Sequence, residues 1–200
     1  MIPRQILVVT SIMLLILIGL GVYAYQLKRR AEDLRHHVTD SRPIAPPIAG
    51  PSEKITLIAA SDNDGSLYRV TVSAPMPAER SARARQIVRT LLDFYSSSAS
   101  PHRIPDRSDV NAVYIVSDNL AVVDMNAAFS DNHPSGVLVE ELSIASIAQT
   151  LSANMPGIMK VKLLIDGHER PTLAGHAELK SVYDVASMNS FVNTDSGTKP

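Results

Sequence analysis

Residues 159–176 read MKVKLLIDGHERPTLAGH, and this stretch decides the fold. Apolar side chains alternate with their neighbours from Val161 to Ile165, which predicts a strand with one buried face. The pair Asp166-Gly167 comes next and tolerates the positive φ that a two-residue hairpin needs. We therefore expect a tight turn at this pair, with the chain returning from Glu169 to Leu173 as a partner strand.

The same stretch resembles the closing signature of the GerMN domain, a family named after a spore-germination and sporulation protein. That signature has an apolar strand ending in Asp-Gly, a short polar return, Leu-x-Gly-His, and an acidic residue with Leu soon after. The matching parts here are Leu164-Ile165-Asp166-Gly167, Leu173-Ala174-Gly175-His176 and Glu178-Leu179.

Two upstream segments extend the resemblance, which covers the chain from Glu53 to Tyr183. Gln149-Thr150-Leu151-Ser152, followed by Met155-Pro156-Gly157-Ile158, is similar to the family's helix end. Ala121-Val122-Val123-Asp124 with Phe129 is similar to its central strand and the aromatic residue after it. The resemblance implies structural roles for the motif residues Asp124, Phe129, Pro156, Asp166, Gly167, Leu173, Gly175 and His176.

Hydrophobic periodicity before this stretch predicts two hairpins, each followed by a helix. The expected strands are 54–60, 67–72, 110–116 and 120–125, and the expected helices are 78–95 and 137–154. The first helix should bury Ala84, Ile87, Val88, Leu91, Leu92 and Tyr95, and the second Ile144, Ala145, Ile147, Ala148 and Leu151. The fold class is therefore α+β, with a mixed or antiparallel sheet of hairpins and two helices packed on one face, in the order ββαββαββ.

The segment from Ile6 to Tyr25 contains no charged residue and predicts a transmembrane helix. At ~1.5 Å per residue such a helix spans about 30 Å, the thickness of a bilayer core. A cleaved signal peptide is the alternative, because Val22-Tyr23-Ala24 offers small residues at cleavage spacing. The length of the apolar run favours an uncleaved anchor.

Two observations predict opposite orientations of this segment in the membrane. Lys28, Arg29 and Arg30 follow it, and the positive-inside rule would keep them cytoplasmic. The GerMN resemblance implies that the domain lies outside the cytoplasmic membrane. We favour the second reading, a single-pass protein of the cytoplasmic membrane with an extracytoplasmic domain.

The expected organisation has four parts: a signal-anchor helix over residues 1–27, a charged stalk and proline-rich linker over 28–52, a GerMN-like domain over 53–183, and a disordered tail over 184–200. The linker contains Pro43, Pro46, Pro47 and Pro51, and such segments favour an extended conformation that holds a domain off the bilayer. The tail is rich in Ser, Asn and Thr and has no hydrophobic period.

The composition excludes several classes of function. A net charge of −1 argues against a general nucleic-acid binder, which needs a basic excess. The absence of cysteine removes disulfides, thiolate nucleophiles, cysteine zinc sites and a lipid-modified cysteine anchor. We expect no cofactor and no metal.

Arg80, Arg83, Arg85 and Arg89 on the first helix are the candidate binding residues. Grouped guanidinium groups bind anionic glycans, lipid headgroups or acidic partner proteins. The alternative is a solvated basic face balanced by Glu79 and Asp93.

We expect several carboxylates to have structural roles. Asp124 lies among apolar residues, and we expect backbone amides of residues 126–130 to bind it. Glu140 and Glu141 fall in the first turns of a helix, where negative charge complements the helix dipole. The run 62–64 reads as a turn, because further acidic calcium ligands are missing.

The residues of the expected final hairpin suggest an alternative function, that of an enzyme. His168, His176, Asp166 and Glu169 lie close together in sequence and could form a metal or acid-base site of an envelope hydrolase. The simpler reading is a bend at Gly175 with the His176 imidazole bound to backbone. We expect a membrane-tethered, non-catalytic interaction domain of the cell envelope, whose partners are envelope proteins, further copies of itself or an anionic glycan.

Overall fold

The computed structural model describes residues 50–97 and 100–191. The expected membrane anchor and most of the stalk and linker lie outside these residues. Within the described ranges, no helix combines the length and the apolar character that crossing a membrane requires.

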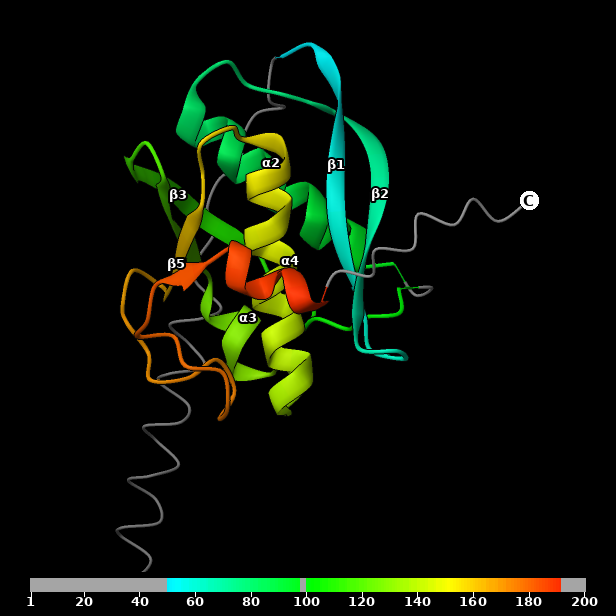
Figure 1. The fold of residues 1–200 in the computed structure, drawn as a ribbon, viewed down its shortest axis with the longest axis vertical. Coiled ribbons are helices and arrows are strands. Elements are labelled where there is room, and N and C mark those ends of the chain that lie inside the picture. Colours follow the sequence, from blue (N-terminus) through cyan, green and yellow to red (C-terminus); the bar gives the residue numbers. More distant parts are fainter. Residues whose placement is uncertain (1–49, 98–99, 192–200) are drawn as a thin grey trace, which may run out of the picture. The chain divides into compact units, whose positions relative to one another are not determined.

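The domain begins with a long antiparallel hairpin (Figure 1). Strand β1 (Ser52–Ser61) pairs along its whole length with β2 (Ser66–Pro75), and the two form a sheet of their own. Residues 62–65 make the turn, where Gly65 has a φ of 68°. The predicted first hairpin and its turn are confirmed.

A second sheet has four strands in the order β3-β4-β5-β6. These are β3 (Val110–Ser117), β4 (Leu120–Met125), β5 (Lys160–Ile165) and β6 (Tyr183–Asp184). The β3-β4 and β5-β6 pairs are antiparallel, whereas β4 and β5 are parallel. The sheet is mixed, as predicted, and a helical crossover joins its two parallel strands.

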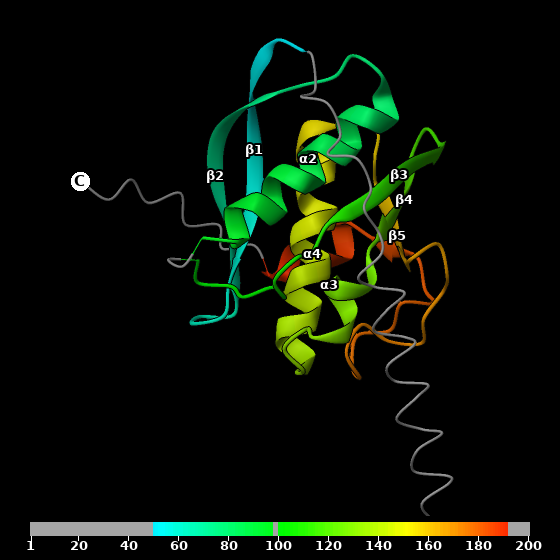
Figure 2. The same cartoon turned by 180° about the vertical axis from the view of Figure 1, so that it is seen from behind.

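The α-helices among the described residues are α2 (Arg80–Tyr95), α3 (Ala127–Asp131) and α4 (Val137–Asn154). The buried residues of α2 are the predicted set of six. Helix α4 differs, because its residues from Leu142 to Ala148 are all buried. In Figures 1 and 2, α4 lies between the β1-β2 hairpin and the four-stranded sheet. Apolar neighbours on both sides account for its burial on every side.

The prediction of one sheet with two helices on one face is therefore wrong in its layering. The hairpin and the four-stranded sheet are separate, and α4 packs along β1 while α2 packs beside β3. The physical reason lies in α4, which carries buried polar groups as well as apolar ones and binds an edge of β1 with them.

The edge of β1 that faces away from β2 is bound by side chains of the helices. The Asn154 side chain accepts a hydrogen bond from Thr56 N at 2.9 Å and donates one to Thr56 O at 2.6 Å. The Thr150 hydroxyl accepts from Ile58 N at 2.9 Å, and the Ser146 hydroxyl donates to Ile58 O at 2.6 Å. These bonds satisfy backbone groups that a neighbouring strand would otherwise bind.

The predicted return strand after Asp166-Gly167 does not form. Ile165 and His168 make an isolated bridge across the turn, and the chain then leaves the sheet. Pro171 has no backbone N–H to donate to a strand partner. Tyr183 pairs with Val161 instead, so the short strand β6 occupies the edge of β5.

The prediction of disorder from Asp184 onward is also wrong for the part of the tail that the structure describes. Asp184 belongs to β6, and a 3-10 helix, η1, follows at Ala186–Phe191. The Gln149 side chain donates to Val185 O at 3.0 Å, and Met188 is buried. Both contacts hold this segment against α4.

Candidate functional site

Asp124 fixes the turn after β5. Its carboxylate accepts a hydrogen bond from Gly167 N at 2.7 Å, and the residue is 7% exposed. Asp166 and Gly167 have φ values of 48° and 74°, so the predicted tight turn is confirmed. The expected donors of residues 126–130 are wrong, because the turn of the neighbouring parallel strand supplies the amide. Asp124 therefore acts as a structural clamp between two strands.

Glu140 holds the loop 174–177 to the start of α4. Its carboxylate is fully buried, and one oxygen accepts from the backbone N–H groups of Ala174, His176 and Ala177 at 3.0, 3.0 and 2.9 Å. The other oxygen lies 3.0 Å from His176 Nδ1 and 3.2 Å from Gly136 N. The helix-dipole reading of Glu140 is thus incomplete, because the carboxylate also joins two segments.

The surroundings of Glu140 favour its ionised form. Burial raises the pKa of the carboxyl, but hydrogen bonds from the Ala174 amide, the His176 ring and the other amides lower it to about 2. The buried charge is therefore compensated by donors on both oxygens.

The two histidines of the enzyme hypothesis are engaged in different contacts. His176 Nδ1 faces Glu140, while His168 Nδ1 lies 2.6 Å from Asp166 O. Gly175 bends the chain with a φ of 123°, as expected, but the His176 ring meets the carboxylate of Glu140 rather than the backbone. In the described part of the chain, no group of three or more His, Asp or Glu side chains is placed to hold a metal ion.

The remaining motif residues shape the core and its connections. Phe129 on α3 is fully buried, with its ring edge-on to His133 at a centroid distance of 5.5 Å. Leu173 is buried, and its carbonyl accepts from the Ser130 hydroxyl at 2.5 Å. Pro156 lies two residues after the end of α4 and is exposed.

Each of the four arginines on α2 has a partner within the domain. Arg83 binds both carboxylate oxygens of Glu53, at 3.0 and 2.5 Å. Arg85 donates to Val110 O at 3.0 Å, and Arg89 lies 3.9 Å from Asp109. Arg80 lies 3.8 Å from the carboxylate of Asp118. An anionic ligand would have to compete with these contacts, and the Arg83–Glu53 pair is bidentate.

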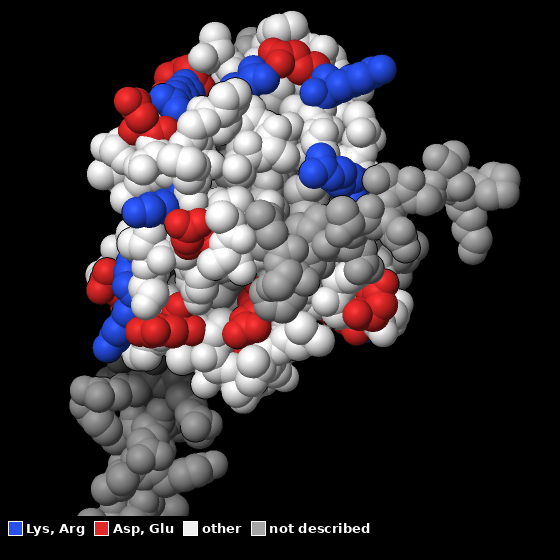
Figure 3. All heavy atoms as spheres, viewed as in Figure 1, with Lys and Arg blue, Asp and Glu red and all other residues white. Residues whose placement is uncertain are grey.

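The surface in Figure 3 carries both signs of charge. Basic and acidic side chains are spread over this face, and no continuous basic area forms on it. This face offers no electrostatic footprint for a polyanion.

The outer face of the four-stranded sheet is apolar and partly uncovered. Tyr114 pairs with Val122 across β3 and β4, and Val122 pairs with Lys162 across β4 and β5, so the three share one face. Tyr114 is 53% exposed and its neighbour Val116 is 64% exposed. The half-buried Leu120 and Val122 complete what we call the outer patch: Tyr114, Val116, Leu120 and Val122.

The loop 166–182 covers only the other end of this face. Lys162 lies under that loop, where its ammonium group binds Lys180 O and, at 2.9 Å, the Glu169 carboxylate. Lys162 is therefore 8% exposed, although it belongs to the outer face. The outer patch lies beyond the cover that this loop provides.

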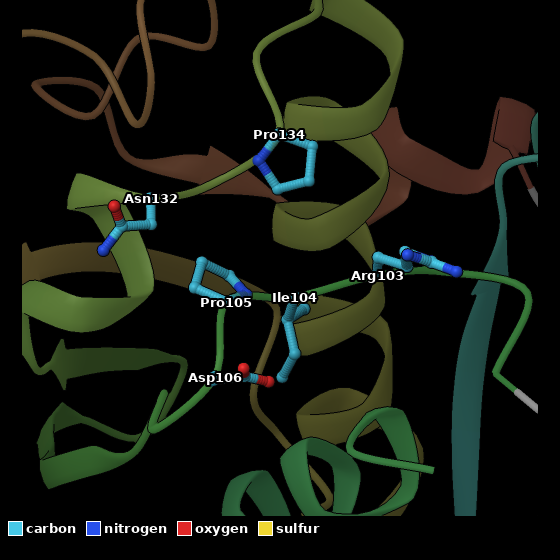
Figure 4. A pocket seen from close by; sticks show the side chains of 6 residues that line it. All are labelled: Arg103, Ile104, Pro105, Asp106, Asn132 and Pro134. Atoms are coloured by element: carbon cyan, nitrogen blue, oxygen red, sulfur yellow. The ribbon is translucent and has the colours of Figure 1, made fainter. Parts of the chain in front are cut away.

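A pocket of about 390 Å³ lies between the loop 103–106 and the segment before α4 (Figure 4). Arg103, Ile104, Pro105, Asp106, Asn132 and Pro134 line it. Figure 4 shows the Arg103 side chain pointing away from Asp106, so the two charged groups do not converge on one point. The pocket therefore lacks the convergent polar groups of a small-molecule site.

The sequence interpretation missed two groups of residues. One is Glu140 with its loop, and the other is the set of His102, His133 and Ser143, which are buried, with the partly exposed Asp62. A signal for both was present in α4, where the polar residues Glu140, Ser143, Ser146 and Thr150 lie among apolar ones. Polar residues inside a buried helix need hydrogen-bond partners, which marks their positions for attention.

Comparisons with known proteins bear on the family. The model of the Germane domain, described as "Sporulation and spore germination", matches residues 56–171. No curated protein matches.

Several solved structures are similar, and three of them each have a TM-score of 0.47. A candidate lipoprotein from Clostridium perfringens shares 14% identity, over 75% of this chain and 98% of that one. The first GerMN domain of the Bacillus subtilis sporulation protein GerM shares 24%, over 64% of this chain and 94% of that one. The tandem GerMN domains of GerM share 23%, over 64% of this chain and 44% of that one.

Proposed function

Because this chain belongs to the Germane family of sporulation and spore germination domains, we propose that it is a membrane-tethered, non-catalytic interaction domain of the bacterial cell envelope. The domain recognises a partner protein, either another envelope protein or a further copy of itself, through the outer patch. The expected anchor over Ile6–Tyr25 keeps it at the extracytoplasmic surface of the cytoplasmic membrane.

The observation that carries this proposal is the exposure of the outer patch. Tyr114 and Val116 each expose more than half of their surface, on a strand whose other face lies in the core. Grouped apolar and aromatic side chains on a surface are typical of protein contacts, and tyrosine is enriched at their centres. Asp118 and Lys160 are exposed beside the patch and would supply a polar rim.

The non-catalytic part of the proposal is supported by how the candidate side chains are used. His176 and Glu140 join a loop to a helix, and Asp166 forms a turn that Asp124 clamps. His168, the remaining histidine of the enzyme hypothesis, is exposed and binds the carbonyl of a residue in its own turn. These contacts all serve the fold.

Site-specific photo-crosslinking in membranes tests this proposal. A photoreactive amino acid replaces Tyr114 in the full chain, and a second version carries it at Thr71, which is exposed on β2, away from the patch. We expect a discrete adduct from position 114 and none from position 71. The adduct mass separates self-association, which gives a multiple of the chain mass of 21.6 kDa, from a different partner.

A matched variant makes the result specific. Val116→Asp places a charge beside position 114 and should remove the adduct, because desolvating a carboxylate opposes an apolar contact. Equal adduct yields from positions 114 and 71, or an adduct that Val116→Asp leaves unchanged, would contradict the proposal.

A further inference from the structure

Four polar side chains form a continuous hydrogen-bonded chain at one end of the domain. His102 Nδ1 lies 2.6 Å from Asp62 Oδ1, and His102 Nε2 lies 2.8 Å from Ser143 Oγ. His133 Nε2 also lies 2.8 Å from Ser143 Oγ, while its Nδ1 lies 2.9 Å from Pro134 O. His102 is fully buried, and Ser143 and His133 are 2% and 6% exposed. Water therefore has little access to His102, Ser143 and His133.

The acceptors at the two ends of this hydrogen-bonded series, Asp62 and Pro134 O, determine which ring nitrogens carry protons. The carbonyl of Pro134 can only accept, so His133 Nδ1 carries a proton. An ionised Asp62 can also only accept, so His102 Nδ1 carries a proton. If both rings were neutral, both Nε2 atoms would be acceptors that face the same hydroxyl.

The Ser143 hydroxyl has one hydrogen, and Val139 O lies 3.1 Å from it as a third acceptor, so this hydrogen cannot satisfy both imidazole nitrogens. One further proton resolves the conflict. When His102 Nε2 carries it, this nitrogen donates to Ser143 Oγ, and Ser143 donates to His133 Nε2. The four contacts from Asp62 to Pro134 are then satisfied. They are satisfied equally if the proton between Asp62 and His102 Nδ1 lies on the carboxylate, because His102 Nε2 still carries a proton and donates to Ser143.

We infer that Asp62, His102, Ser143 and His133 form a largely buried proton-binding site, which holds one proton more than an ionised carboxylate and two neutral imidazoles would hold. The ligand of this site is the proton, and its counter-charge is the Asp62 carboxylate. Losing the proton breaks one buried hydrogen bond in the chain and leaves an acceptor unsatisfied.

The groups packed around the site fit this assignment. Asp62 Oδ2 lies 3.4 Å from Arg103 N, the Tyr95 ring lies edge-on to His102 at 4.9 Å, and Phe129 lies edge-on to His133. Burial lowers the pKa of His133, and the hydrogen bond to the Pro134 carbonyl opposes that effect only in part, with smaller opposition from the carboxylates of Glu140 and Asp62. The extra proton is therefore placed on the side of the site where Asp62 lies.

An alternative use of the same residues is as a Ser-His-Asp catalytic triad, whose order they match. Ser143, however, lies within the buried part of α4, and its hydroxyl contacts an imidazole on each side as well as Val139 O at 3.1 Å. A carbonyl substrate needs an open approach to such an oxygen and oxyanion donors nearby. The buried setting favours proton binding.

The site connects four separate segments of the domain. Asp62 lies in the β1-β2 turn, His102 in the loop after α2, His133 in the α3-α4 connection and Ser143 in α4. Loss of the proton at high pH should loosen all four contacts together. If the domain lies outside the cytoplasmic membrane, as proposed above, this end of the domain experiences the external pH.

Nitrogen NMR of the full chain with ¹⁵N-labelled histidine, in detergent micelles, tests the inference. The chemical shifts show which ring nitrogens carry protons. The spectra are recorded at pH 7.5, about one unit above the usual histidine pKa. We expect a proton on at least one of the two Nε2 atoms that face Ser143. Spectra in which His102 Nε2 and His133 Nε2 both lack a proton would overturn the inference.

A variant supplies a second, independent test. His133→Phe removes the competing acceptor, so Ser143 is free to donate to a neutral His102. His102 Nε2 should then lose its proton at a pH about one unit lower, a tenfold weaker proton affinity, as expected for one hydrogen bond. His168→Phe, the control, should leave the His102 titration unchanged. An unchanged His102 titration in His133→Phe would also overturn the inference.

Discussion

At the scale of single residues, a buried carboxylate connects the motif loop to the helix that crosses the domain. Glu140 receives three backbone amides of the 174–177 loop, as well as the ring of His176. A buried charge is tolerated only when its donors are complete, and removing the charge leaves those donors without an equal acceptor. The Leu-x-Gly-His signature is thus explained by geometry: Gly175 supplies the bend and His176 supplies a donor to the carboxylate.

Glu140→Gln should destabilise the domain by about 3 kcal/mol, because an amide cannot accept all these hydrogen bonds and places an NH2 group against donors. The measurement is urea unfolding of the full chain at pH 7. Glu141→Gln is the matched control, since Glu141 is the next residue and only half-buried, and it should change stability by less than about 0.5 kcal/mol. Equal effects of the two substitutions would refute the role of Glu140.

The same carboxylate predicts an acid transition. Its pKa is lowered to about 2 in the folded state from an ordinary value of 4.5, so the unfolded chain takes up a proton first as the pH falls. The stabilisation from Glu140 is therefore complete above about pH 4.5 and is lost as the pH falls toward 2. Thermal unfolding followed between pH 5 and pH 2.5 should show a steeper loss in the wild type than in Glu140→Gln. Parallel curves would contradict this assignment.

The sequence could not reveal the role of Glu140, because its partners lie 34 to 37 residues later. Its position in the first turn of a helix has a sufficient local explanation in the helix dipole. Asp124 shows the same limit: its burial and its need for an amide were predictable, but the Gly167 donor is 43 residues away on a parallel neighbour. Local patterns identify which polar groups need partners and leave the partners unspecified.

At the scale of elements, α4 replaces a missing strand beside β1. Ser146, Thr150 and Asn154 recur every four residues and form one ridge of the helix, which lies along the edge of β1. The Tyr95 hydroxyl of α2 adds a contact by accepting from Ala60 N at 2.7 Å. The hairpin is attached to the rest of the domain by directional bonds as well as by apolar packing.

Thr150→Val should cost about 1–3 kcal/mol in unfolding free energy, because Ile58 N then has no acceptor in a buried place while the side-chain volume is kept. Thr90→Val is the control, since its hydroxyl donates only to Gln86 O of its own helix. Denaturant unfolding of both variants measures the difference. A Thr150 variant as stable as the Thr90 variant would show that the ridge does not hold the hairpin.

The existence of these elements followed from periodicity, and α4 was predicted with its observed bounds. The position of α4 between two separate sheets was not predictable from its apolar residues. They mark one side of the helix as buried, whereas the opposite side is buried through the polar ridge. The return strand after Gly167 failed for a related reason. Alternation and a turn favour a hairpin, yet Tyr183 competes for the same edge of β5 from a later position.

At the scale of the whole molecule, the described domain has a closed interior and an open apolar sheet face. The edge of β1 is bound by α4, and the far end of the outer sheet face is covered by the loop 166–182. The outer patch remains exposed, centred on Tyr114 and Val116. On a domain that we propose to be tethered in the envelope, this face is where a partner would bind.

Two substitutions on β3 separate folding from recognition. Val116→Glu should leave the free energy of unfolding within about 0.5 kcal/mol of the wild-type value, because Val116 is largely exposed. Val113→Glu, on the buried face of the same strand, should prevent stable folding, because it buries an unpaired charge. Circular dichroism melts of both variants check this. A Val116→Glu variant that unfolds like Val113→Glu would assign the outer patch to the core.

Radical footprinting of the full chain tests the proposed function most directly. Tyr114 oxidation is compared between the membranes of the cells that make the protein and the detergent-solubilised protein, with half-buried Tyr68 on β2 as the internal reference. We predict that Tyr114 is oxidised several-fold more slowly in the membranes, where its partner covers it, while Tyr68 reacts equally in both. Equal oxidation of Tyr114 in the two samples would contradict the claim that this face binds a partner.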